Sequence, residues 1–136
     1  MIRALVMTHG QIGTELVKVV EMILGPIEGL DAMSNHGLSG DDLRVEAAAW
    51  IGSDPGLVDE SNPLDPPVLI FVDDFGGSCG TAAQFCCAQC PGAAIVAGVN
   101  LAMLLGFVTW REDNDLDELV RQIVQKGRES IVRLGM

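Results

Sequence analysis

Short apolar runs alternate with segments of helical periodicity along the whole chain of 136 residues. Four runs are short and mostly apolar, as expected of strands in a covered sheet: residues 2–7, about 29–33, 68–73 and 93–97. Five other segments repeat apolar residues every three or four positions, which predicts helices: residues about 12–24, 39–52, 78–89, 100–108 and 116–134. The alternation predicts one α/β domain over residues 1–136, an open, mainly parallel four-stranded sheet with helices on both faces.

Local signals place several of the element boundaries. Ser39, followed three residues later by Asp42, matches the pattern of a capping box at a helix start. Residues 53–67 are acidic and rich in proline, which predicts a surface loop. In the last helix we expect one buried side along its full length, formed by Leu119, Ile123, Val124, Ile131 and Leu134.

Charge and composition restrict the classes of partner. Nineteen acidic and eight basic residues give a formal net charge of −11, which argues against nucleic acid or an anionic membrane surface and favours a basic protein partner. No stretch approaches the roughly 20 apolar residues of a membrane helix, and the N-terminus lacks signal-peptide features, so we expect a cytoplasmic protein without membrane insertion. All four cysteines fall between residues 79 and 90, which does not suggest a disulfide framework.

The residues with chemical potential follow two strands that should be neighbours. In a flavodoxin-like strand order 2-1-3-4, the first and third strands flank the crevice where ligands bind. Thr8-His9-Gly10 follows the first strand, and FVDDFGGS, residues 71–78, ends the third. His9 should therefore face a carboxylate, and the strand ends alone leave both Asp73 and Asp74 as candidates.

Such a pair has a definite chemical use. A carboxylate that accepts the Nδ1–H of a histidine leaves Nε2 as a nucleophile. Ser78 and the free N–H groups at the start of the next helix would form an anion site. Together they predict phosphoryl transfer through a phosphohistidine, or acid–base catalysis on a phosphorylated metabolite.

Several motifs resemble one family over nearly the whole length. They are THG at 8–10, MILG at 22–25, VDDFGGS at 72–78, VAGVNLAMLL at 96–105 and DELVRQIVQKGRESI at 117–131. The chain resembles the EIIA component of the mannose family of the bacterial phosphoenolpyruvate-dependent sugar phosphotransferase system. The resemblance implies a phosphotransferase component whose histidine, here His9, receives a phosphoryl group from the phosphocarrier protein HPr and passes it to an EIIB domain.

The resemblance also assigns the surrounding residues. It selects Asp73 as the residue that orients His9, places Asp74 at a variable position, and implies neither cofactor nor metal. Association with membrane EIIC and EIID would run through EIIB, and a homodimer would form by exchange of a C-terminal strand. The phosphoryl-binding residues it implies are Thr8, Gly10, Gly76, Gly77 and Ser78.

The chain departs from the family pattern at two positions. Cys79 and Ala102 stand where the family commonly has proline. Cys79 lies at the expected start of a helix, and one hypothesis is that its thiol is acidified and oxidisable there. Cys87 and Cys90 form a single C-x-x-C pair near the expected end of that helix, which favours packing over zinc binding or redox chemistry.

Other functions remain open at this point. The chain could be a regulatory phosphohistidine module that signals the phosphorylation state, for which the unusual Cys79 and the acidic loop speak. It could also be the related phosphotransfer subunit of dihydroxyacetone kinase, which shares the fold. A thiol redox module based on Cys87 and Cys90 ranks last.

Overall fold

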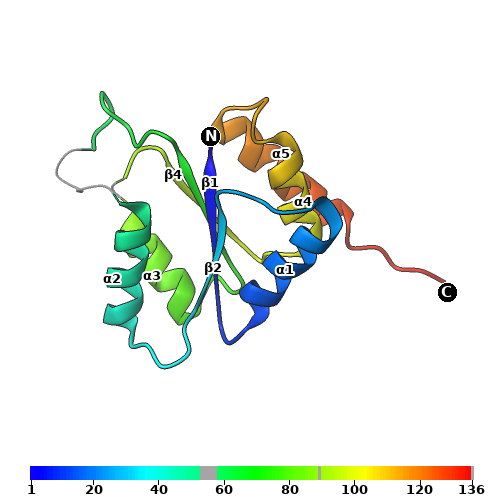
Figure 1. Ribbon diagram of the computed structural model, residues 1–136, viewed down its shortest axis with the longest axis horizontal. Helices are drawn as coiled ribbons and strands as arrows, with labels where there is room; N and C mark the ends of the chain where they lie inside the picture. The colour runs from blue at the N-terminus through cyan, green and yellow to red at the C-terminus, as the bar shows by residue number, and fades with distance from the viewer. Residues whose placement is uncertain (53–57, 89, 136) are drawn as a thin grey trace.

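The structure is a computed structural model that describes residues 1–52, 58–88 and 90–135. In this part of the chain four strands alternate with five helices (Figure 1). The elements in chain order are β1 (Arg3–Thr8), α1 (Ile12–Leu24), β2 (Leu30–Ser34), α2 (Gly40–Ile51), β3 (Val68–Val72), α3 (Ser78–Cys87), β4 (Ala93–Ala97), α4 (Leu101–Trp110) and α5 (Leu116–Glu129). The predicted order of strands and helices is confirmed; some boundaries, such as both ends of α1 and β4, fall where predicted, and the others shift by one to five residues.

The four strands form one sheet with the order β2-β1-β3-β4, and each neighbouring pair is parallel. The predicted flavodoxin-like order is therefore confirmed. Met7 on β1 pairs with Met33 on β2 and with Val72 on β3. This register brings the carboxyl ends of the three strands to the same edge of the sheet.

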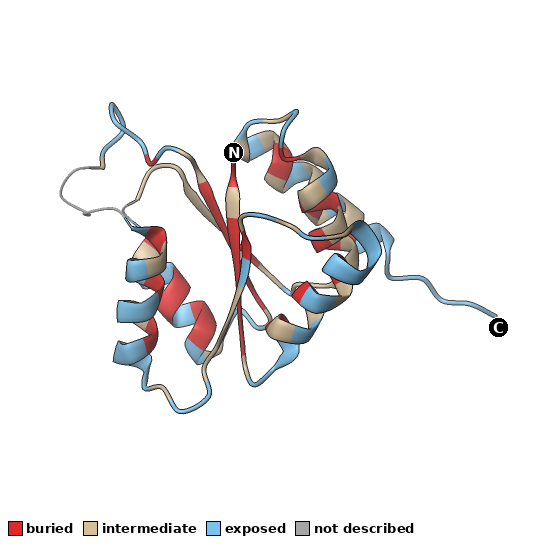
Figure 2. Cartoon of the chain, viewed as in Figure 1, coloured by how far each residue is buried: buried red, intermediate tan, exposed pale blue. Residues whose placement is uncertain are grey.

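Helices cover both faces of the sheet, as Figure 1 shows. Helices α2 and α3 lie on one face, and α1, α4 and α5 lie on the other. Successive side chains of a strand point to opposite faces of the sheet. Ile70 therefore belongs to the hydrophobic core beneath α2 and α3, and Phe71 to the core beneath α1, α4 and α5. Every residue of β3 is consequently buried, which explains its continuous apolar run (Figure 2).

Side-chain caps set the starts of α2 and α4. The Ser39 side chain accepts the Asp42 N–H at 3.1 Å while the Asp42 carboxylate accepts the Ser39 N–H at 3.2 Å, so the predicted capping box is confirmed. Asn100, expected as the first helical residue, is instead the cap of α4 and accepts the Met103 N–H at 3.0 Å. Its amide also donates to the Gly127 carbonyl at 3.2 Å and so links α4 to α5.

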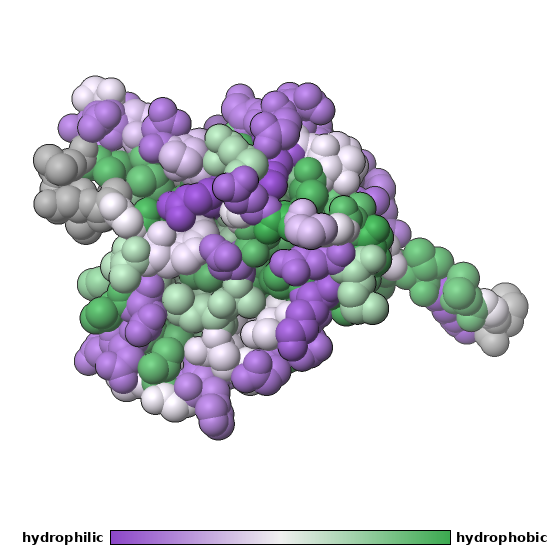
Figure 3. All heavy atoms as spheres, in the orientation of Figure 1, coloured by the Kyte–Doolittle hydropathy of each residue, from purple (hydrophilic) through white to green (hydrophobic). Residues whose placement is uncertain are grey.

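The last helix ends five residues earlier than its apolar spacing predicts. Ile131 and Leu134 are 80% and 89% exposed, so the expectation that they are buried is wrong. The carbonyl of Gly127, in the last turn of α5, accepts hydrogen bonds from the Asn100 amide and the Ser130 hydroxyl. These donors replace the backbone N–H that a further helical turn would supply. Residues 131–135 extend from the body of the protein as a mostly apolar tail (Figure 3).

Parts of two predicted segments are not described by the structure. Residues 53–57 of the predicted acidic loop and residue 89 of the predicted third helix lie outside the described residues. Within the part of the chain that the structure describes, none of the helices combines the length and the hydropathy needed to cross a lipid bilayer.

Gly80 fixes how closely α3 approaches the loop that follows β3. A Cβ at this position would lie 2.5 Å from the carbonyl oxygen of Phe75 and 2.8 Å from that of Asp74. Both contacts are with backbone, so neither can be relieved by rotating a side chain. A residue with a side chain at this position must displace either the loop or the helix.

We therefore expect Gly80→Ala to lower the free energy of unfolding by about 1–3 kcal/mol, the usual cost of overpacking. Gly40→Ala is the matched control, because a Cβ at Gly40, also in a helix, meets no described atom within 4 Å. Urea unfolding of both variants measures the difference. Equal stability of the two variants would contradict the proposed close approach.

Candidate active site

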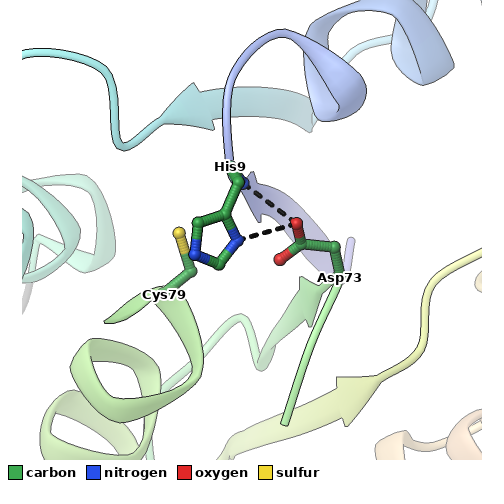
Figure 4. Close-up of side chains that lie close together, drawn as sticks. All are labelled: His9, Asp73 and Cys79. Atoms are coloured by element: carbon green, nitrogen blue, oxygen red, sulfur yellow. Dashed lines mark hydrogen bonds and ion pairs between the residues drawn. The ribbon is translucent and has the colours of Figure 1, made fainter. Parts of the chain in front are cut away.

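The candidate site lies at the carboxyl edge of the sheet, between the turn after β1 and the loop after β3 (Figure 4). From β1 the chain crosses to β2 on one side, and from β2 it crosses over to β3 on the other side. This reversal of strand order is the switch point at which open α/β sheets bind ligands. His9 and Asp73 each come directly after one of the two central strands.

His9 and Asp73 are joined by two hydrogen bonds. The ring Nδ1 of His9 lies 2.9 Å from Asp73 Oδ2, and the backbone N–H of His9 donates to the same oxygen at 3.0 Å. The backbone N–H of Asp74 donates to the other oxygen, Oδ1, at 3.0 Å. The carboxylate is thus held at both oxygens, and the histidine ring is held against it.

The structure places Asp73, and not Asp74, against the ring. The Asp74 side chain is exposed and accepts the Gly76 N–H at 3.3 Å, which closes the loop after β3. Sequence reasoning from strand ends alone left the two residues equivalent. The register of β3 separates them, because Val72 is its last residue and Asp73 is the first to leave the sheet.

The hydrogen bond determines which ring nitrogen is free. A carboxylate only accepts, so Nδ1 carries the hydrogen and the lone pair of a neutral ring lies on Nε2. The His9 side chain is 44% exposed, whereas that of Asp73 is 17% exposed. Burial raises the pKa of Asp73, but the hydrogen bonds from the His9 ring and backbone outweigh it and hold the pKa below its usual value. The half-exposed ring therefore has its lone pair on Nε2, with an ionised carboxylate at Nδ1.

The start of α3 lies directly against the ring. A Cβ on Gly77 would lie 2.6 Å from Cε1 of His9 and 3.1 Å from Nε2, so only glycine fits here without moving the ring. Gly77 is the N-cap of α3 and provides no side-chain cap, and Ser78 is the exposed first residue of the helix. The first-turn N–H groups and the positive end of the helix dipole can therefore serve an anion near Nε2.

The remaining predicted residues hold the turn that carries His9. Thr8 is buried, and its hydroxyl accepts the Gly13 N–H at 2.7 Å, which ties the end of β1 to the start of α1. Gly10 has a positive φ of 56°, which favours glycine, and its N–H donates to the Asn35 side chain at 3.0 Å. The structure thus gives Thr8 and Gly10 partners in the turn itself.

Asn35 was missed by the sequence reasoning. It follows β2, whose carboxyl end lies beside that of β1, and its own N–H donates to the Thr8 carbonyl at 3.2 Å. The rule that singled out His9 and Asp73, that residues after neighbouring parallel strands meet at one edge, could have found it as well.

Cys79 also lies at this site, but not as a reactive thiol. Its side chain is fully buried beneath the start of α3. Burial and the nearby charge of Asp73 raise the pKa of the thiol. The hypothesis of an acidified Cys79 is therefore wrong, because burial and the nearby carboxylate disfavour the thiolate more than the helix start favours it.

The other cysteines fit a packing role as well. Cys87 is buried, and burial raises the pKa of its thiol to about 12. Burial also raises the pKa of Cys86. These directions disfavour the redox reading, which needs a thiolate near neutral pH.

Comparison with known proteins gives the same picture. A family described as "PTS system fructose IIA component" matches residues 3–124. The mannose-specific EIIAB components of Escherichia coli K12 and Shigella flexneri are each 32% identical over 139 aligned residues, covering 93% of this chain. The chain spans 38% of the length of these curated relatives.

Solved structures with low sequence identity share the fold. An EIIA component from Streptococcus agalactiae superposes with a TM-score of 0.81 at 22% identity, covering 98% of this chain and 97% of that one. A mannose/sorbose-specific IIA subunit from Enterococcus faecalis superposes with a TM-score of 0.76, also at 22% identity, covering 98% and 95%.

The family match over residues 3–124 and the shared α/β fold define the class: the chain is related to the IIA components of the sugar phosphotransferase system. More specifically, it belongs to the mannose family of EIIA components.

The position of Gly77 can be tested through the ring that it contacts. We expect Gly77→Ala to push the imidazole away from its place against α3 and to weaken its bond to Asp73. Proton–nitrogen NMR of the ring should show one tautomer with Nδ1–H in the unmodified protein and a mixture in the variant. Gly76→Ala is the matched control, since a Cβ there meets no described atom within 4 Å. An unchanged tautomer in Gly77→Ala would contradict the contact.

The Asp73 carboxylate should contribute to stability with a defined pH dependence. Because its pKa is lower in the folded state, the contribution is complete above the ordinary pKa of 3.8 and is lost as the pH falls through the folded pKa. We expect Asp73→Asn to cost about 1.5–3 kcal/mol at about pH 5, as for hydrogen bonds to a charged group. The cost should shrink steadily below pH 3.8.

Urea unfolding between about pH 5 and pH 2.5 measures this cost. Asp74→Asn removes the same charge from an exposed side chain and controls for the change in net charge. A cost of Asp73→Asn that stays constant over this pH range would show that ionisation of the carboxylate does not stabilise the fold.

Proposed function

We propose that this protein is a phosphocarrier, in which His9 accepts a phosphoryl group from phosphorylated HPr and passes it to an EIIB partner. The observation that carries the proposal is the 2.9 Å contact between His9 Nδ1 and Asp73. It leaves Nε2 as the free nitrogen of a ring whose side chain is 44% exposed. Membership in the mannose family of EIIA components supports the same reaction.

The transfer step balances without any proton leaving the ring. The Nε2 lone pair attacks the phosphorus of the donor phosphohistidine in line, the donor N–P bond breaks, and its electron pair returns to the donor ring. His9 keeps its hydrogen on Nδ1, so the phosphorylated ring becomes an imidazolium. The ionised Asp73 stabilises this positive charge through the hydrogen bond that is already present.

The start of α3 is suited to receive the phosphoryl oxygens. The Gly77 backbone lies against Nε2, and the N–H groups and hydroxyl at Ser78 follow directly. An anion at a helix N-terminus is stabilised by these donors and by the helix dipole. In this proposal Gly76 and Gly77 let the backbone approach, and Thr8 and Gly10 hold the turn that carries His9.

The charge of the chain fits basic partners. Its formal net charge is −11, and the exposed Asp74 directly follows Asp73, the partner of His9. A basic phosphocarrier would be steered toward such a surface, with an association rate that falls as salt is added. The curated relatives are EIIAB components, so we propose an EIIB domain as the acceptor and membrane EIIC and EIID as indirect partners through EIIB.

The proposal predicts one phosphoryl group on one histidine. Incubation with phosphoenolpyruvate, enzyme I and HPr should add a single acid-labile phosphoryl group, detected by intact-protein mass spectrometry. His9→Ala should abolish it. The chain has two histidines, and His36→Ala is the matched control that should be labelled normally. Labelling that persists in His9→Ala would overturn the proposal.

The two aspartates should differ in their effect on the transfer rate. Loss of a charge-assisted hydrogen bond of about 1.5–3 kcal/mol corresponds to a rate about 10- to 150-fold lower. We expect this loss for Asp73→Asn, and a nearly unchanged rate for Asp74→Asn, whose side chain bonds only within its loop among the described residues. Rapid-quench labelling from phosphorylated HPr measures both rates. Equal effects of the two substitutions would contradict the assignment.

A further inference from the structure

The phosphoryl-transfer site contains a third side chain that the proposed function does not use. Figure 4 shows His9, Asp73 and Cys79 close together. A ring nitrogen, a carboxylate oxygen and the sulfur of these residues all lie within 4.8 Å of one another. They come from the turn after β1, the loop after β3 and the first turn of α3, so three separate segments hold them in place.

The spacing is close to that of metal ligands. With bonds of about 2.0–2.3 Å, the nitrogen, oxygen and sulfur ligands of a tetrahedral zinc ion lie about 3.4–3.6 Å apart. Separations of at most 4.8 Å would need to close by about 1 Å, which small rotations of these side chains can provide. The His9 nitrogen and the Asp73 oxygen are already 2.9 Å apart.

The chemistry of the three ligands selects the kind of cation. Thiolate and imidazole favour Zn²⁺ and similar cations over Mg²⁺ and Ca²⁺, which prefer oxygen. Thiolate and carboxylate together supply two negative charges, which a divalent cation neutralises. The thiol proton leaves to solvent when the sulfur binds the metal.

A cation could reach the group from the solvent side. Cys79 itself is fully buried, but the His9 side chain next to it is 44% exposed. Three protein ligands leave a fourth position for water, as in open zinc sites. The alternative is that Cys79 only packs beneath α3 together with its apolar neighbours, such as Ala83. The two readings differ in what removal of the sulfur does to metal binding.

We propose that His9, Asp73 and Cys79 form a binding site for a thiophilic divalent cation such as Zn²⁺, and that this cation and a phosphoryl group exclude each other at His9. The binding site stands on geometry, whereas the mutual exclusion rests on the proposed phosphocarrier function. A cation on Nε2 blocks the attacking lone pair. A cation on Nδ1 displaces the hydrogen bond to Asp73. In both cases the ring is no longer a nucleophile.

Titration of the full, unphosphorylated chain with Co²⁺ tests the site without any phosphoryl donor. We expect one Co²⁺ to bind per chain and to give a thiolate-to-cobalt charge-transfer band. Zn²⁺ should displace the Co²⁺ and remove the band, whereas Mg²⁺ should not. Cys79→Ser should abolish the band and weaken Zn²⁺ binding at least about tenfold, and Cys79→Ala should do the same. Circular dichroism confirms that the variants are folded.

Cys86→Ser is the matched control, since this cysteine lies on the same helix but outside the group. It should leave the band unchanged. A band of equal strength in Cys79→Ser, a band lost in Cys86→Ser, or no band in the unmodified protein would each overturn the proposed site.

A second measurement tests the exclusion. Zn²⁺ should slow labelling of the unmodified protein from phosphorylated HPr, and Cys79→Ser should resist Zn²⁺ relative to its own metal-free rate. Equal sensitivity of the two proteins would contradict the exclusion. The two proposals fail separately: metal binding without any metal-free labelling would remove the phosphocarrier function, and labelling without the cobalt band would remove the cation site.

Discussion

The parallel pairing of β1 with β3 is the constraint on which the rest of the site depends. Met7 pairs with Val72, so β1 and β3 end next to each other, and the residues that follow them, His9 and Asp73, are neighbours. The register cannot slip by one residue, because each step would move the side chains of β3 to the opposite core. The packing of both faces therefore also fixes the 2.9 Å contact between the ring and the carboxylate.

Around this contact, backbone groups do much of the positioning. The Asp73 carboxylate accepts two backbone N–H groups in addition to the ring, and Gly77 lets the start of α3 lie against Nε2. Asn35 holds the turn from the other side through Gly10. The backbone around the site is thus held in place, which suits a reaction whose demands are position and charge. The same closeness brings the sulfur of Cys79 within reach of the ring.

The fold was predictable because its signals are local and repeated. Apolar runs and helical periods define the elements, and the crossover rule then restricts the strand order. The choice between Asp73 and Asp74 was not local, since one residue of register decides it, and only the family resemblance selected Asp73. Asn35 was missed because it meets Gly10 only through the pairing of β2 with β1. The burial of Cys79 depends on how α3 packs, which its position at a helix start does not reveal.

The central claim is that Asp73 occupies Nδ1 and thereby makes Nε2 the nucleophile. The most direct measurement is long-range proton–nitrogen NMR of the phosphorylated, nitrogen-15-labelled protein, which identifies the ring nitrogen that carries phosphorus. The account predicts a phosphoryl group on Nε2 of His9, with Nδ1 still protonated. A phosphoryl group on Nδ1 would contradict it, because the bond to Asp73 could not then exist.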